Sequence, residues 1–101
     1  MAPDAPLYLG AHHFDGDPAT LLPAYHRLIE AFGLSNLPLH LCIVRDGGLT
    51  VFDACPAQAV FDEFARSPMF LGAVAAAGLP APRTEGLGDL HLAHIADGVR
   101  A

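Results

Sequence analysis

Asp46-Gly47-Gly48 separates two strand-like stretches near the middle of the chain, Leu37–Arg45 and Leu49–Ala54. Asp-Gly and Gly-Gly pairs tolerate the positive φ angles that tight hairpin turns require. The sequence therefore predicts an antiparallel hairpin at this point. No other feature constrains the fold as strongly, because the elements on either side must join one sheet through these two strands.

The half of the chain before the hairpin has the pattern of a strand followed by a helix. Residues Leu7–Phe14 form the predicted strand. Asp17 is a candidate N-cap, and Pro18 suits the first helical position. We expect the helix to end at Gly33, with an irregular first turn at Pro23, where a hydrogen bond is lost. Its apolar stripe has spacings of three and four: Leu21, Leu22, Tyr25, Leu28, Ile29 and Phe32.

The half after the hairpin has the pattern of a helical region followed by a strand. Pro56 opens a helix, and Ser67-Pro68 caps a further helical stretch over Met69–Ala77, which Gly78 ends. The final strand is predicted over Gly88–Ile95.

Two strand-helix-strand halves joined by a hairpin predict an α+β fold. The arrangement is the ferredoxin-like split βαβ, with order β-α-β-β-α-β and a four-stranded antiparallel sheet. The first and third strands are central, and the helices cover one face only. No repeat or long linker interrupts the chain, so residues 1–101 are predicted to form a single domain.

Composition excludes several classes of partner. The net charge is −6, and the five basic residues are isolated arginines, so nucleic acid and anionic membranes are not expected partners. No apolar run approaches the roughly 20 residues of a membrane span, and the start lacks a basic signal-peptide region, so a cytoplasmic location is expected. Cys42 and Cys55 are expected to be free thiols. A hydrophobic content of 52% in so short a chain predicts a homodimer.

Alternation along the strands predicts which side chains share a sheet face. A two-residue turn at Asp46-Gly47 or Gly47-Gly48 places Asp53 on the same face as His40, and in the first register pairs them directly; a three-residue loop would reverse this. We assign an aliphatic set to the helix-covered face: Leu7, Leu9, Ala11, Leu37, Leu39, Leu41 and Ile43. The uncovered face then receives Tyr8, His12, Phe14, His40, Cys42, Val44 and Asp53, with His91 if Leu90 and Leu92 pack on the helices.

This set of histidines with one carboxylate is the candidate site. A carboxylate beside an imidazole orients it and raises its basicity, as a general base requires. The structural alternatives are hydrogen-bonded interface histidines and an Asp53 that caps the following helix. No short metal-ligand pair such as His-Glu-x-x-His is present, so metal is the weaker alternative and no cofactor is predicted. The candidate catalytic residues are His12, His40, Asp53 and His91, and the candidate substrate contacts are Tyr8, Phe14 and Cys42.

The chain resembles the dimeric α/β barrel superfamily, which includes antibiotic-biosynthesis monooxygenases, polyketide cyclases, muconolactone isomerases and stress-responsive barrel proteins. The resemblance extends over nearly the whole length, and is closest to short members without assigned function. It rests on the element order, the hairpin, and the motifs Asp15-Gly16-Asp17-Pro18, Val60–Phe64, Ser67-Pro68-Met69-Phe70, His40 and His91. It implies two sheets packed face to face in a homodimer, with a ligand cavity.

Three functions are compatible with this pattern. The first is a small cofactor-independent enzyme, of monooxygenase, cyclase or isomerase type, acting on a hydrophobic oxygenated aromatic or polyketide-like molecule. In it His40, oriented by Asp53, accepts a proton, and His12 or His91 stabilises oxyanion charge. The second is a non-catalytic ligand-binding or dimeric interaction domain whose histidines weaken the dimer between about pH 7 and 5. The third is a metal- or haem-binding barrel protein, with His26 as the helix histidine.

Overall fold

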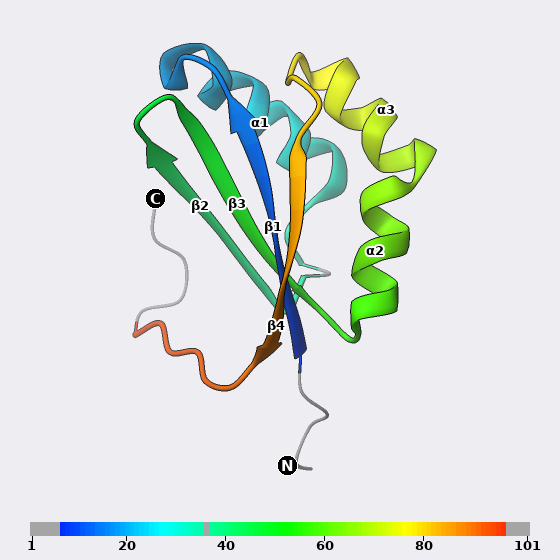
Figure 1. Cartoon of the computed structure of the whole chain (residues 1–101). Coiled ribbons are helices and arrows are strands. Elements are labelled where there is room, and N and C mark those ends of the chain that lie inside the picture. The colour runs from blue at the N-terminus through cyan, green and yellow to red at the C-terminus, as the bar shows by residue number, and fades with distance from the viewer. Residues whose placement is uncertain (1–6, 36, 97–101) are drawn as a thin grey trace.

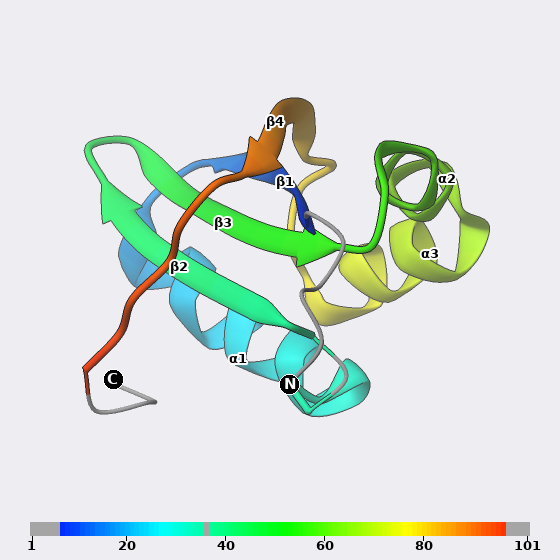
Figure 2. The same cartoon turned by 90° about the horizontal axis from the view of Figure 1, so that it is seen from below.

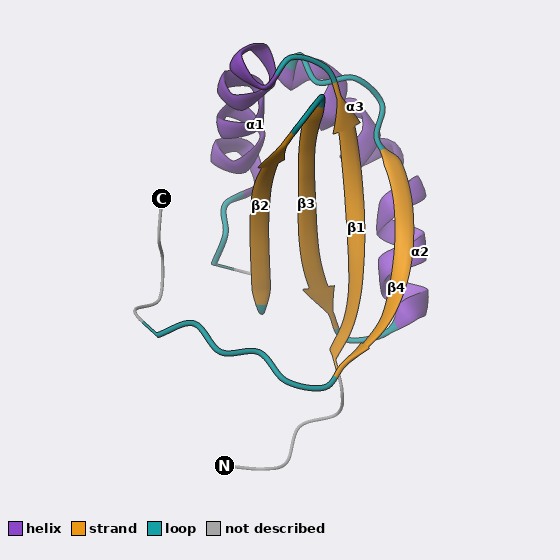
Figure 3. Cartoon of the chain, turned by 60° about the vertical axis from the view of Figure 1, so that its left-hand side comes forward, coloured by secondary structure: helices purple, strands orange, loops and turns teal. Residues whose placement is uncertain are grey.

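A four-stranded antiparallel sheet with strand order β2-β3-β1-β4 forms the framework of the computed structural model, and helices lie on one of its faces (Figure 1, Figure 3). The structure describes residues 7–35 and 37–96. This confirms the α+β fold class and the central position of the first and third strands. In chain order the elements are β1 (Leu7–Asp15), α1 (Pro18–Phe32), β2 (Leu39–Arg45), β3 (Gly48–Cys55), α2 (Gln58–Arg66), α3 (Pro68–Ala77) and β4 (Arg83–Leu90).

The first helix begins and ends at the residues that the sequence indicated. The Asp17 side chain accepts a hydrogen bond from the Ala19 backbone N–H at 3.1 Å, and Gly33 ends the helix with a φ of 75°. The helix is continuous through the exposed Pro23, so the expected irregular turn is not observed. Its buried face consists of Leu21, Ala24, Tyr25 and Leu28.

The hairpin has the two-residue turn Asp46-Gly47, in which Gly47 has a φ of 82°. This turn sets the register of β2 against β3, and His40 lies directly opposite Asp53. Of the two registers compatible with the sequence, the one that pairs these residues directly is therefore adopted. β3 also pairs with β1, with Asp53 opposite Gly10, so β3 brings residues of β1 and β2 next to one another.

The second helical region consists of two helices that meet at Ser67. Its hydroxyl accepts a hydrogen bond from the Phe70 backbone N–H at 3.1 Å, which starts α3, and Gly78 ends α3 with a φ of 94°. The α2 helix begins at Gln58, two residues after Pro56. Figure 2 shows α1 lying below β2 and β3, while α2 packs against β1 and β4. Among the described segments, no helix is long and apolar enough to cross a membrane.

The candidate residues of β1, β2 and β3 share one face of the sheet, as predicted. That face is the helix-covered one, so the prediction that they lie on the uncovered face is wrong. His12, Phe14, His40 and Asp53 line a cavity between sheet and helices, whereas Leu41 and Ile43 are 37% and 44% exposed on the uncovered face. The central strands decide the side, because their helix-facing residues are the bulky core groups. The even-numbered residues of β2 pair with the odd-numbered residues of β3, so their side chains lie on the same face as those of β3. Those core groups are Phe14, Leu49 and Val51, at most 5% exposed.

The last strand also differs from its prediction. It spans Arg83–Leu90 and not Gly88–Ile95. Leu90 pairs with Leu7, where β1 begins, so the residues after Leu90 have no described strand to extend along. His91 and His94 therefore lie in an exposed segment beyond the sheet.

An exposed ion-pair network joins three strands at the turn end of the sheet. Asp15 accepts hydrogen bonds from Arg45 at 2.8 Å and from two nitrogens of Arg83 at 2.9 Å. The two guanidinium groups hold the pKa of the Asp15 carboxyl well below its usual range, Arg83 having the larger effect. Because all three side chains are solvated, the network contributes little to stability and mainly aligns β1, β2 and β4.

Gly10 in β1 is required by close packing. The ring of Phe61, a buried residue of α2, lies directly over Gly10, and a Cβ at this position would overlap the ring. The pairing of β1 with β4 also shifts register at this point. The glycine therefore lets α2 approach the sheet closely enough for Phe61 to contact both Tyr8 and His12.

We expect Gly10→Ala to lower the free energy of unfolding by about 1–3 kcal/mol, because the added methyl group overpacks the core against Phe61. Gly72→Ala is the matched control: Gly72 lies within α3, and a Cβ added there would meet nothing within 4 Å. That variant should gain up to about 1 kcal/mol from helix propensity. Urea unfolding followed by circular dichroism measures both. Equal effects of the two substitutions would contradict the role of Gly10.

Candidate functional site

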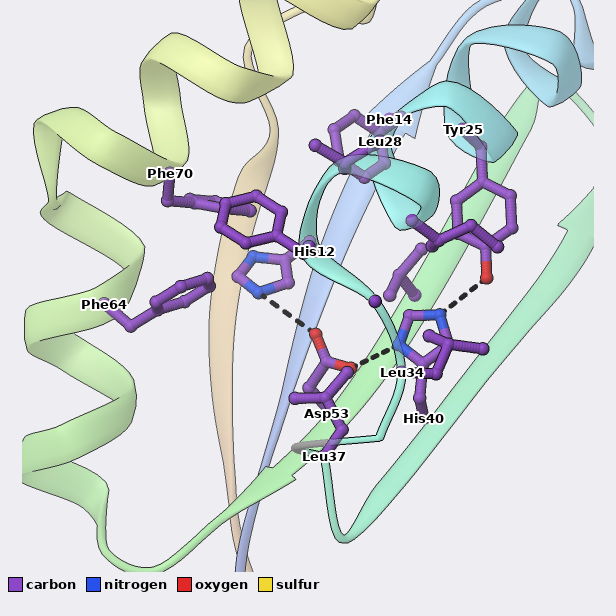
Figure 4. Close-up of a pocket in the computed structure, with 14 residues that line it drawn as sticks. His12, Phe14, Tyr25, Leu28, Leu34, Leu37, His40, Asp53, Phe64 and Phe70 are labelled. Atoms are coloured by element: carbon purple, nitrogen blue, oxygen red, sulfur yellow. Dashed lines mark hydrogen bonds and ion pairs between the residues drawn. The ribbon is translucent and has the colours of Figure 1, made fainter.

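A cavity of about 190 Å³ lies between the helix-covered face of the sheet and the helices. Its wall is mostly aromatic and aliphatic, with contributions from all three helices and from β1, β2 and β3. The polar side chains on the wall are His12, Tyr25, His40 and Asp53 (Figure 4). An apolar pocket with a few convergent polar groups is the usual form of a small-molecule site.

The hairpin register brings His40 and Asp53 together. The two residues are a cross-strand pair, and His40 Nδ1 lies 2.5 Å from Asp53 Oδ1. Both side chains are partly buried, so water competes little for this bond. Since the ionised carboxylate can only accept, His40 Nδ1–H donates, and the proton-accepting position of a neutral His40 is Nε2.

Tyr25 completes a hydrogen-bonded chain of three side chains. Its hydroxyl oxygen lies 2.6 Å from His40 Nε2, and its ring stacks on the imidazole with an interplanar angle of 3°. Burial raises the pKa of Tyr25 above its usual range, so the phenol remains protonated and donates to Nε2. We call Tyr25, His40 and Asp53 the proton relay.

Tyr25 is the functional residue that sequence reasoning alone misses. It belongs to the apolar stripe of the helix, and it is indeed 6% exposed. A buried tyrosine hydroxyl nevertheless needs a hydrogen-bond partner. A tyrosine on a core-facing stripe opposite a strand histidine is therefore the signal that could have found it.

His12 lies on the other side of Asp53 from His40. It is 1% exposed, and its ring packs between Phe61 and Phe70, with centroid distances of 5.4 and 4.9 Å. Nδ1 lies 3.1 Å from the Thr84 hydroxyl, while Nε2 lies 3.8 Å from Asp53 Oδ2. That second separation is too long for a hydrogen bond. Burial lowers the pKa of His12, against the opposing influence of Asp53, so the imidazole is neutral near pH 7.

Four of the sequence-predicted site residues line the cavity, and three do not. His12, Phe14, His40 and Asp53 are on its wall. Tyr8 is buried against Phe61 outside the cavity. Cys42 packs against the core nearby, where burial raises the pKa of its thiol, and His91 lies in the exposed segment after β4.

Aromatic rings from the helices form the remaining wall. Phe64 of α2 and Phe70 of α3 are in contact, with centroids 4.6 Å apart, and Phe32 of α1 lies 6.0 Å from Phe64. They place apolar surface around the cavity that contains Asp53, and a surrounding of low dielectric constant strengthens electrostatic interactions.

The polar groups of the site suit proton transfer better than metal binding. Within residues 7–35 and 37–96, no cluster of three or more His, Cys, Asp or Glu side chains is arranged to hold a metal ion. A carboxylate that orients an imidazole, which in turn bonds a hydroxyl, is the arrangement that activates a hydroxyl group for acid-base or nucleophilic chemistry.

Comparisons of the chain with protein-family models, with curated proteins and with solved structures found no match.

The burial of neutral His12 predicts a pH-dependent stability. The unfolded chain takes up a proton at this residue as the pH falls through about 6.5, whereas the folded chain resists it because the pKa is lowered. Stability therefore falls as the pH is lowered from 7.5 to 5. One proton accounts for at most about 1.4 kcal/mol per pH unit.

We expect His12→Phe, which keeps a ring between Phe61 and Phe70, to flatten this dependence. His26→Phe, at an exposed position of α1, is the control and should retain the wild-type slope. Urea unfolding at several pH values between 5 and 7.5 measures the slopes. Identical slopes for wild type and His12→Phe would contradict the assignment of a neutral, buried imidazole.

Proposed function

We propose that this protein is a cofactor-independent enzyme that removes a proton from a small, hydrophobic, oxygenated substrate. The observation that supports this most directly is the proton relay, in which Asp53, His40 and Tyr25 form an unbroken hydrogen-bonded chain on the wall of the cavity. Deprotonation is the first step common to isomerisation, cyclisation and cofactor-independent oxygenation of enolisable or phenolic compounds.

The size of the cavity favours a single-ring substrate. An apolar cavity of about 150 Å³ is enough to hold benzene, and this one measures about 190 Å³. Leu34, part of the wall at the start of the α1–β2 connection, is 39% exposed, so the wall reaches the protein surface there. A substituted six-membered ring fits these dimensions, whereas a multi-ring polyketide would extend out of the cavity.

The residues of the relay have distinct roles in the proposed step. The Tyr25 oxygen accepts a carbon-bound proton of the substrate while its own proton passes to His40 Nε2. Asp53 stabilises the resulting imidazolium through its 2.5 Å hydrogen bond to Nδ1. The raised pKa of Tyr25 fits this role, because a free phenolate would not be stable in the buried site and the two transfers must be coupled.

The uncovered face of the sheet supports a second element of the proposal, a homodimer. We call the row Leu39, Leu41 and Ile43 of β2, with Phe52 of β3 beside it, the apolar patch; cross-strand pairing places Phe52 opposite Leu41. Leu41 and Ile43 are among the exposed large hydrophobic residues. Apolar side chains grouped on one sheet face favour burial by a partner. A second copy packed against this face is the arrangement that the resemblance to dimeric α/β barrels implies.

Two free cysteines fit a cytoplasmic location.

We expect substitutions in the relay to abolish turnover. Asp53→Asn and Tyr25→Phe should each lower kcat/KM by about 10²–10⁴-fold, the usual contribution of general acid-base catalysis. The assay uses a panel of single-ring phenols, quinols and enolisable cyclic ketones, followed by oxygen uptake and by exchange of substrate protons for deuterium. His40→Gln is the third relay variant. Its control is His26→Gln, since His26 is exposed on α1. Unchanged rates in all three relay variants would contradict the proposed chemistry.

The homodimer is tested with two neighbouring residues of β2. Ile43→Asp places a charge on the apolar patch and should raise the dimer dissociation constant at least about tenfold. Val44→Asp is the matched control, because Val44 is also exposed, at 58%, but belongs to the opposite set of alternating residues. Sedimentation velocity over a concentration series measures both. A monomeric wild type, or equal effects of the two variants, would contradict association through this face.

A further inference from the structure

The proton relay leaves one polar atom of the cavity without a role. His12 Nε2 is fully buried, and no described residue lies within hydrogen-bonding distance of it. Figure 4 shows that it points across a gap to Asp53 Oδ2, the carboxylate oxygen that His40 does not use. A buried polar atom of this kind is normally paired. Because His12 is one of the residues that line the cavity, a group bound there is the candidate for the missing partner.

The surroundings of His12 determine which nitrogen holds the proton. The Thr84 hydroxyl, 3.1 Å from Nδ1, can donate or accept, so it permits either tautomer. Asp53 Oδ2 decides between them, because a lone pair on Nε2 would face an anionic oxygen at 3.8 Å, whereas an N–H is attracted to it. The neutral imidazole therefore has its proton on Nε2, and this tautomer is assigned from the network.

The gap thus has a donor on one side and an acceptor on the other. At 3.8 Å the two atoms are too far apart to bond directly, but a hydroxyl oxygen can lie about 2.8 Å from both. A hydroxyl accepts from His12 Nε2–H and donates to Asp53 Oδ2, which satisfies both. A carboxylate would be repelled by Asp53, and an ammonium group would face the N–H of His12.

We propose that His12 Nε2 and Asp53 Oδ2 bind the hydroxyl group of a neutral, single-ring phenol or cyclic enol. The ring of this ligand lies against Phe64 and Phe70, which belong to the same wall. The inference rests on the cavity of the proposed function and names its substrate class. It makes Asp53 a shared group, with Oδ1 on His40 and Oδ2 on the ligand hydroxyl.

The test is a binding comparison in which no turnover is needed. Phenol, toluene and benzylamine, which share one ring, are titrated into the full chain at pH 7 and followed by calorimetry. We expect phenol to bind at least about tenfold more tightly than toluene, because toluene leaves Nε2 unpaired. Equal affinities for phenol and toluene overturn the proposal. Tighter binding of benzylamine overturns it too, because it indicates the opposite tautomer.

His12→Phe separates the hydroxyl contact from the shape of the cavity. This variant should lose the preference for phenol and keep its affinity for toluene. His94→Phe, in the exposed segment after β4, makes the same substitution outside the cavity and should behave as wild type. A phenol preference that persists in His12→Phe overturns the proposal.

A measurement on the wild-type chain keeps the test independent of any variant's folding. Long-range ¹H–¹⁵N correlation spectra distinguish protonated from unprotonated imidazole nitrogens. His12 should show its proton on Nε2 and His40 on Nδ1, and phenol but not toluene should shift the His12 Nε2 resonance. A His12 proton on Nδ1, or no shift with phenol, overturns the inference.

His40→Gln distinguishes failure of this inference from failure of the proposed function. The variant removes the relay histidine but leaves His12 and Asp53 in place, so it should lose turnover and keep its preference for phenol. Turnover that depends on His40, in a protein that binds phenol and toluene equally, would leave the proposed function standing and overturn the hydroxyl site. A phenol preference without turnover on any panel substrate would do the reverse.

Discussion

The carboxylate of Asp53 is the group around which the rest of the site is organised. It lies between two imidazoles on the helix-covered face of the sheet, with Oδ1 bonded to His40 and Oδ2 directed toward His12. A buried anion is costly unless polar partners surround it. The convergence of His40, Tyr25 and His12 on one small region follows from that requirement. His40 is held in turn by the Tyr25 hydroxyl, and His12 by the Thr84 hydroxyl.

Preorganisation of this cluster comes from the sheet, and its closure comes from the helices. His12, His40 and Asp53 lie on three adjacent strands whose register is set by backbone pairing. The helices add Tyr25 and the aromatic wall, and apolar surroundings strengthen polar contacts by lowering the local dielectric constant. Three of the four polar side chains on the cavity wall come from strands, whereas the helices supply Tyr25 and most of the aromatic surface.

Each face of the sheet has residues of the type more usual on the other. The covered face has a polar centre, whereas aliphatic residues such as Leu41 and Ile43 lie on the uncovered face. A polar centre in the interior lowers stability unless every group is satisfied, and His12 Nε2 lacks a partner among the described residues. The first feature supports the proposed ligand on the inner face, and the second supports the proposed second copy on the outer face.

The amino-acid sequence by itself determined the turns and helix ends, and which strand side chains lie on a common face of the sheet. Turn chemistry at Asp46-Gly47-Gly48 predicted the hairpin and, for a two-residue turn, the common face of His40 and Asp53, because a hairpin depends on residues that are neighbours in the chain. Strand alternation placed His12 on the same face, and the structure selected the Asp46-Gly47 turn that pairs His40 directly with Asp53. Only the tertiary structure decided which side of the sheet they occupy, since alternation is symmetric until helices pack on one face. Packing against the bulky residues of β1 and β3 resolved that choice. It also brought Tyr25 to His40 and left His91 outside, because both outcomes depend on contacts between distant segments.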